Sequence, residues 1–258
     1  MIICKSRAEI EKMRAAGKIV AEALRLVQNE AKKGVTTQAL NEMVEKFLKA
    51  KKAIPAFKGY RGYPAAICTS VGYEVVHGIP GPRRLKEGDI LSVDIGVKYN
   101  GYYADAAATY GIGSLDAEAQ RLIATTKKSL EAGIKEAKVG NYLSDISKAI
   151  QQVAEAAGYS VVRDFVGHGI GKSMHEEPQV PNYVDTHKGP KLKEGMVLAL
   201  EPMVNQGTYE VEILNDGWTV ATKDRKLSAH FEHTVLITEG EPEVLTCTDE
   251  DNGPLKPK

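Results

Sequence analysis

Apolar residues recur at helical spacing in four segments of the chain, each bounded by residues that favour helix ends. The first helix is expected to start at a capping-box pattern, Ser6 followed by Glu9, and to end near Gly34. The fourth is expected to end at Gly158, because glycine readily adopts the left-handed backbone that closes a helix. The spacing predicts helices over about 7–34, 37–52, 116–138 and 144–157.

Shorter apolar runs, several of them alternating with polar residues, lie between and after these helices. Their pattern predicts strands near 66–70, 89–98, 102–109, 160–164, 195–203, 209–215, 218–222 and 230–238. Gly, Pro and Tyr dominate 54–64, which is therefore expected to be a loop. The chain thus runs helix, helix, strands, and then repeats that order. This order predicts an α+β fold with antiparallel sheet and helices on one face.

No Ser-rich or Pro-rich linker separates the two halves, so a single domain over 1–258 is expected. Its halves are predicted at about 1–110 and 111–250, and the polar tail 250–258 is expected to be disordered. Lys plus Arg and Asp plus Glu each total 34, and the resulting zero net charge argues against stable nucleic-acid binding.

The three cysteines, Cys4, Cys68 and Cys247, are odd in number and too widely spaced for a disulfide framework. The start of the chain has too short an apolar run for a signal peptide. No apolar run approaches the ~20 residues that span a bilayer. These features predict a soluble, reduced, cytoplasmic protein with no membrane partner.

Two aspartates interrupt the apolar strand pattern of VDIGVKYNGYYADAAAT (93–109). Asn-Gly at 100–101 is a strong signal for a tight hairpin turn. Counting outward from this turn puts Asp105 opposite Gly96 and on the same face as Asp94. The two aspartates are then diagonal neighbours, whose Cβ atoms lie ~7–8 Å apart or somewhat less. Three explanations remain open at this point. The face could be solvated, one aspartate could be protonated, or a metal cation could lie between them.

Further candidate ligands follow along the chain. His168 lies between glycines in GHGIG, Glu201 ends an apolar run before Pro202, and Glu232 interrupts another predicted strand. Each of these residues could have a purely structural role when taken alone. The joint occurrence of carboxylates in four predicted strands favours a common role as ligands. An oxygen-rich set with one imidazole suits Mn, Fe, Co or Zn, and four carboxylates can neutralise two divalent ions. His77 and His175 are two further candidate histidines near this set.

At this point long stretches of the chain match one known family. The chain resembles the type I methionine aminopeptidases over nearly its whole length. The matching stretches are GYRGYPAAICTSVGYEVVHGIP (59–80), LKEGDILSVDIGVKYNGYYADAAAT (85–109), FVGHGIGKSMHEEP (165–178), VLALEPMV (197–204) and DGWTVATKDRKLSAHFEHTVLIT (216–238). The resemblance implies the pita-bread fold, in which a curved antiparallel sheet has pseudo-symmetric halves and helices on its outer face.

The resemblance also implies an activity: removal of the N-terminal methionine from nascent proteins and peptides when the second residue is small. Two divalent ions would be held by Asp94, Asp105, His168, Glu201 and Glu232, with a metal-bridging hydroxide attacking the first peptide bond. In the family pattern Asp105 and Glu232 bridge the two ions, and a monovalent cation can lie nearby. His77, His175 and Glu201 would be the catalytic side chains, of which both histidines also bind substrate.

A methionine pocket is implied at Tyr60, Tyr63, Cys68 and Trp218. Thioether contacts with aromatic rings are favourable, so these residue types suit a methionine side chain. Two positions depart from the family pattern. Phe57 stands where a cysteine is common, and Met174 stands where an aromatic residue is common. These departures bear on the fine side-chain preference rather than on the reaction.

The chain is expected to be the short bacterial form, because it lacks the long insertion of type II enzymes and an N-terminal Cys/His extension. The resemblance implies a monomer that associates transiently with the ribosome. Two rivals remain. An X-Pro aminopeptidase or prolidase shares the fold, although those enzymes usually carry a large N-terminal domain. A non-catalytic relative that binds peptide or nucleic acid would be expected to have lost metal ligands.

Overall fold

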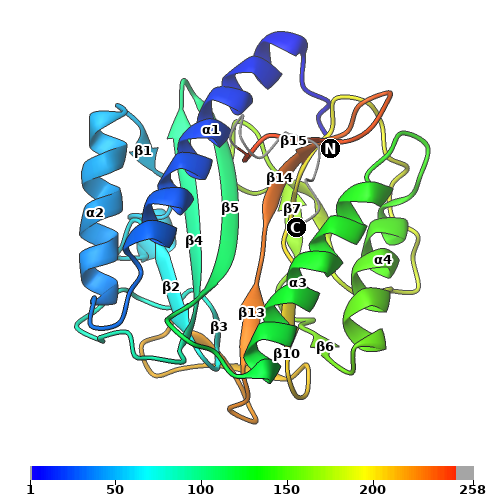
Figure 1. Cartoon of the computed structure of the whole chain (residues 1–258). Coiled ribbons are helices and arrows are strands. Elements are labelled where there is room, and N and C mark those ends of the chain that lie inside the picture. Colours follow the sequence, from blue (N-terminus) through cyan, green and yellow to red (C-terminus); the bar gives the residue numbers. More distant parts are fainter. Residues whose placement is uncertain (1, 248–258) are drawn as a thin grey trace.

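The structure is a computed structural model, and it describes residues 2–247. Four helices lie in front of the strands in Figure 1: α1 (Arg7–Glu30), α2 (Thr37–Ala50), α3 (Ala117–Glu136) and α4 (Leu143–Ala156). The prediction of an α+β fold with antiparallel sheets is confirmed. None of the helices in the described part is long and apolar enough to cross a membrane. The predicted disordered tail, 250–258, lies outside the described residues.

All four predicted helices form, and the capping box predicted for the first helix is confirmed. The Ser6 amide donates to the Glu9 carboxylate at 2.9 Å, while the side chains of Thr36 and Asp116 accept from the first turns of α2 and α3. The predicted end of α1 near Gly34 is wrong. The helix ends at Glu30 because Ala31 takes an extended backbone conformation, although its side chain is still buried.

The centre of the first half is a long hairpin of β4 (Ile90–Tyr99) and β5 (Tyr102–Gly111). Asn100 and Gly101 both have positive φ, 50° and 85°, as a two-residue hairpin turn requires. The register confirms the sequence-based count, with Gly96 opposite Asp105. The other edge of β4 pairs with β1 (Ile54–Pro55) and β2 (Cys68–Val71), so the predicted loop 54–64 contains a short strand and a 3-10 turn, Tyr60–Gly62.

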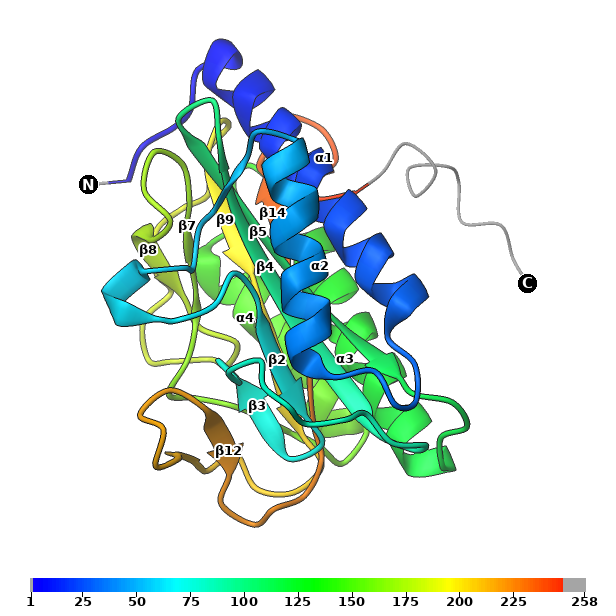
Figure 2. The ribbon, with the colours of Figure 1, turned by 90° about the vertical axis from the view of Figure 1, so that its left-hand side faces the viewer.

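The second half builds a five-stranded sheet in the order β15-β14-β9-β7-β8 and a three-stranded sheet, β13-β10-β6, while β3 of the first half pairs with β12 in a third sheet, β11-β12-β3. Figure 2 shows β4, β5, β14 and β9 running side by side behind α1 and α2. The strands are β3 (Glu74–Val76), β6 (Ser160–Val161), β7 (Gly167–Gly169), β8 (Glu176–Val180), β9 (Val197–Leu200), β10 (Met203–Asn205), β11 (Val211–Ile213), β12 (Val220–Thr222), β13 (Ser228–His230), β14 (His233–Leu236) and β15 (Glu243–Val244).

Two of the long predicted strands, 195–203 and 230–238, are each broken in two. The first breaks at Glu201, before Pro202, which has no amide hydrogen for a ladder. The second breaks at Glu232, whose backbone exchanges hydrogen bonds with Ala107 of β5, at 2.9 and 3.3 Å. The idea that Glu201 and Glu232 lie within strands is therefore wrong. Both sit at the points where strands change partners.

The remaining differences concern short elements. Predicted strands at 160–164, 209–215 and 218–222 are shorter in the structure, and β3, β7, β8 and β15 were not predicted. The strands β3, β7 and β15 span two or three residues, which carry too little periodicity to be recognised, and β8 contains Pro178, which weakens a strand pattern. Two apolar cores support the layers: one joins α1 and α2 to β4 and β5, and the other joins α3 and α4 to β9, β13 and β14.

Candidate metal centre and adjoining pocket

A cavity of about 350 Å³ opens between the two halves, and every residue singled out from the sequence lines it. Those residues are Phe57, Tyr60, Tyr63, Cys68, His77, Asp94, Asp105, His168, Met174, His175, Glu201, Trp218 and Glu232. They come from strands and loops spread over residues 57–232 that only the fold brings together. Sequence reasoning missed other lining residues, namely Arg61, Val76, Asp164, Phe165, Val166 and Gln179.

The β4–β5 hairpin supplies the two aspartates. Asp94 and Asp105 project from adjacent strands onto the same face, as the register requires. Asp105 is 4% exposed, and its backbone N–H and C=O are both bonded to the Thr234 hydroxyl, at 3.0 and 2.8 Å. Thr234 therefore holds the backbone that carries Asp105. No pattern in the sequence pointed to this role.

His168 and Glu201 face each other across β7 and β9. The Nδ1 of His168 donates to the Gly169 carbonyl oxygen at 2.9 Å, because a carbonyl can only accept. The neutral ring then has its lone pair on Nε2, which lies 3.5 Å from Glu201 Oε1. Asn182 donates to the Glu201 carbonyl oxygen at 3.1 Å and supports the strand break there. Asn182, too, was missed from the sequence.

Ligand atoms of Asp105, His168 and Glu232 all lie within 4.8 Å of one another. One oxygen on each of Asp94, Asp105 and Glu232 is buried without a hydrogen-bond partner among the described residues. A buried polar atom without a partner is costly, and three of them converging on one cavity require an explanation. An oxygen-rich donor set with one neutral imidazole suits a divalent transition metal. The residues present therefore fit a metal site.

The pKa shifts of these residues also support a metal site. Burial, together with the neighbouring carboxylates, raises the pKa of Asp94, Glu201 and Glu232 well above the usual range. Burial raises the pKa of Asp105 to about 6 and lowers the pKa of His168 to about 4. Four carboxylates cannot all be ionised in so small a volume without cations. A protonated pair remains the alternative for the metal-free state, whereas a solvated sheet face is wrong because the oxygens are buried.

Two further histidines flank the carboxylates. His77 has a positive φ of 61° and packs edge-on against Phe165, with ring centroids 5.4 Å apart. Burial lowers the pKa of His77 to about 4, and burial also lowers the pKa of His175. The Nδ1 of His175 lies 2.8 Å from the Tyr60 hydroxyl. When that hydroxyl donates, the proton of the neutral imidazole is on Nε2, and His175 becomes a hydrogen-bond donor in the cavity.

The apolar end of the cavity is one packed cluster that contains Phe57, Tyr63, Cys68, Met174 and Trp218. Tyr63 and Trp218 pack edge to face with centroids 5.2 Å apart. Gly96 does not leave open space beside the aspartates. A Cβ on Gly96 would lie 2.6 Å from the Phe57 ring, so this glycine makes room for Phe57 instead.

Comparison with known proteins agrees with this geometry. The model of metallopeptidase family M24 matches residues 11–239. A methionine aminopeptidase of Clostridium acetobutylicum is 56% identical, over 96% of this chain and 100% of its own length. The chain belongs to the methionine aminopeptidases of family M24.

Solved structures agree with the M24 assignment. A methionine aminopeptidase from Thermotoga maritima matches with a TM-score of 0.94 and 48% identity, covering 96% of this chain and 100% of that one. The prolidase of Pyrococcus horikoshii matches with a TM-score of 0.76 at 23% identity, covering 96% of this chain and 65% of that one. The second likeness concerns the fold alone. The pita-bread fold implied by the sequence is confirmed.

Proposed function

We propose that this M24 chain removes the N-terminal methionine from peptides and nascent proteins whose second residue is small. The observation that carries the proposal is the juxtaposition, in one cavity, of a buried carboxylate–histidine set and a sulfur- and ring-lined apolar pocket. The first could hold divalent metal, and the second suits an unbranched thioether. Relatives named methionine aminopeptidase support the same assignment.

We propose that Asp94, Asp105, His168, Glu201 and Glu232 hold two divalent ions, which would be Mn, Fe, Co or Zn. Divalent ions bound there would supply Lewis-acid polarisation of the scissile carbonyl and a water of lowered pKa. The three partnerless carboxylate oxygens support this assignment. The neutral His168, with its Nδ1 donating to a backbone carbonyl, is in the tautomer that a metal-binding Nε2 needs. We also propose, as the family resemblance implies, a monovalent cation near this site.

The side chains around this set would act on the substrate directly. We propose that His175, with its proton on Nε2, donates to the oxygen of the first peptide bond as negative charge develops there. His77, which lines the same cavity, would also bind the peptide. Glu201 would accept a proton and pass it to the leaving amine, for which its raised pKa is suitable.

The methionine side chain would lie among Phe57, Tyr63, Cys68, Met174 and Trp218, with Tyr60 at the margin of the same cluster. Burial raises the pKa of Cys68, so its thiol stays neutral and serves as a small apolar surface. Met174 contributes a second sulfur atom to the pocket wall, on a flexible side chain. This composition supports a preference for methionine over branched aliphatic side chains.

The test is release of the first amino acid from Met-Ala-Ser, with Leu-Ala-Ser, Met-Leu-Ser and Ala-Pro-Ser as controls. Each peptide is assayed after chelation and after adding back Mn, Co or Fe. Metal-restored cleavage of Met-Ala-Ser alone is expected. Cleavage of Ala-Pro-Ser instead would assign the chain to the X-Pro enzymes. No cleavage with any metal would favour a non-catalytic binding protein.

We also propose that the chain works as a single catalytic domain, as a monomer in the cytoplasm, and that it associates transiently with the ribosome. Two contacts between the halves support one domain: the backbone hydrogen bonds between Ala107 and Glu232, and the pairing of β3 with β12. Sedimentation of the purified chain would test the monomer, and co-sedimentation with ribosomes would test the association.

A further inference from the structure

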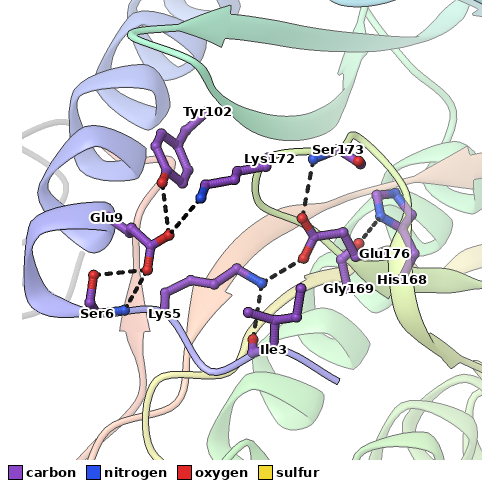
Figure 3. A network of polar contacts seen from close by, with 10 residues as sticks. All are labelled: Ile3, Lys5, Ser6, Glu9, Tyr102, His168, Gly169, Lys172, Ser173 and Glu176. Atoms are coloured by element: carbon purple, nitrogen blue, oxygen red, sulfur yellow. Dashed lines mark hydrogen bonds and ion pairs between the residues drawn. The ribbon is translucent and has the colours of Figure 1, made fainter. Parts of the chain in front are cut away.

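The first described residues of the chain run beneath the turn that carries two of the cavity's side chains (Figure 3). Lys5 Nζ donates to Glu176 Oε2 at 2.6 Å and to the Ile3 carbonyl oxygen at 3.0 Å. The side chains of Lys5 and Glu176 are only 4% and 12% exposed. This ion pair is therefore largely removed from water. It joins parts of the chain that are 171 positions apart in sequence.

Glu176 uses its two oxygens for different purposes. While Oε2 accepts from Lys5, Oε1 accepts from the Ser173 N–H at 3.1 Å and so closes residues 170–175, the β7–β8 turn. The pair also packs directly on that turn. A Cβ on Gly171 would lie 2.5 Å from Lys5 Cε and 2.7 Å from Glu176 Oε1. The backbone of the β7–β8 turn thus rests against the ion pair.

The lysine is itself held in place by the backbone. The Lys5 N–H donates to the Gly195 carbonyl oxygen at 2.6 Å, just before β9 begins. On the other side of the β7–β8 turn, Glu9 of α1 accepts from the Tyr102 hydroxyl at 2.8 Å and pairs with Lys172 at 3.4 Å (Figure 3). The N-terminal segment therefore contacts the β7–β8 turn at two places, of which Lys5 is the buried one.

The β7–β8 turn carries Met174 and His175, and both line the cavity. His175 immediately precedes Glu176 in the chain, and its ring lies 4.3 Å from the His168 ring, centroid to centroid. A displacement of Glu176 would therefore move His175 with it. Buried charges left without a partner draw water or rearrange, so loss of the lysine would displace Glu176.

We propose that the Lys5–Glu176 ion pair is a positioning device that sets the β7–β8 turn so that His175 and Met174 face the substrate. Neither Lys5 nor Glu176 lines the cavity, so both act through the turn. The inference rests on the proposed function for the roles of His175 and Met174. The restraint of the turn itself does not depend on it.

The experiment compares Lys5→Met and Glu176→Gln with the wild-type chain. Glu176→Gln keeps an oxygen for the Ser173 N–H and replaces the oxygen that accepts from Lys5 with an uncharged NH2 group, so it carries the test should Lys5→Met fail to fold. The matched control is Lys138→Met, which removes an exposed ion pair to Glu241 (2.9 Å; side chains 41% and 79% exposed) between the end of α3 and the β14–β15 turn. Metal content is measured for every variant.

The first readout is independent of activity. Amide hydrogen exchange in a peptide covering the β7–β8 turn is expected to accelerate in Lys5→Met and Glu176→Gln, but not in Lys138→Met. The second readout is kcat on Met-Ala-Ser, which is expected to fall about 10- to 100-fold with metal content unchanged, as for a reacting group displaced by ~1 Å. In a His175→Ala background the same substitutions are expected to change kcat by less than about twofold.

Unchanged exchange in both variants would overturn the proposal, as would a loss of kcat that persists in full in the His175→Ala background. The second result would mean that the pair acts on general stability rather than on His175. An inactive wild-type chain would remove the proposed function, while the exchange experiment would still decide whether the pair restrains the turn.

Discussion

Asp105→Asn is expected to make the metal-free protein more stable while it weakens metal binding. The carboxyl of Asp105 is buried beside other carboxylates, and burial raises its pKa from the usual 3.8 to about 6. The difference of roughly 2 pKa units corresponds to about 3 kcal/mol of unfolding free energy that the ionised side chain removes from the metal-free fold. Asparagine has nearly the same shape and carries no charge.

The direction of the Asp105 pKa shift decides at which pH its carboxyl destabilises the fold. A carboxyl whose pKa is higher in the folded state favours folding when protonated, so its destabilising effect is absent below about pH 4 and complete above about pH 6. Buried neutral histidines act in the opposite sense across this range, because burial lowers the pKa of His77 and His168 to about 4. The informative quantity is therefore the difference between variant and wild type at each pH.

The assay is urea unfolding of chelated wild type and chelated Asp105→Asn from pH 4 to pH 8. The two are expected to coincide at the acid end, and the variant to gain up to about 3 kcal/mol by pH 7.5, or roughly 6–12 °C in Tm. Adding Mn should raise the Tm of the wild type much more than that of the variant. A chelated variant that is less stable than wild type at pH 7.5 would refute the argument that burial of the ionised Asp105 carboxylate destabilises the metal-free fold.

Three other substitutions test individual contacts. Gly96→Ala places a Cβ 2.6 Å from the Phe57 ring. We expect the free energy of unfolding in urea to fall by about 1–3 kcal/mol and the KM for methionyl peptides to rise. An unchanged KM would show that Phe57 is not part of the methionine pocket. Thr234→Val leaves the buried backbone N–H of Asp105 without a hydrogen-bond acceptor. The free energy of unfolding should fall by about 1–3 kcal/mol in the same assay, and by less in Thr234→Ser, which keeps the hydroxyl. His175→Ala should lower kcat about 10²-fold with metal content intact by elemental analysis; lost metal would show that His175 is a ligand.

The helices and the central hairpin were predictable because their signals are local. The capping residues and the 3.6-residue periodicity lie within a few positions of one another, and Asn100-Gly101 specifies its own turn. That turn sets the register of the hairpin, which places Asp94 and Asp105 on one face. Short strands such as β3 and β7 were missed because they span three residues each and depend on partners from distant parts of the chain.

The sequence by itself determined the residue types of the site and the hairpin geometry that pairs its two aspartates. Only the tertiary structure decided that Glu201 and Glu232 lie at strand breaks, because a break occurs where a strand changes partners and no local pattern encodes the partner. The same holds for Thr234, Asn182 and the Lys5–Glu176 pair. Their contacts join segments far apart in the chain, and burial against those segments gives each polar group its function.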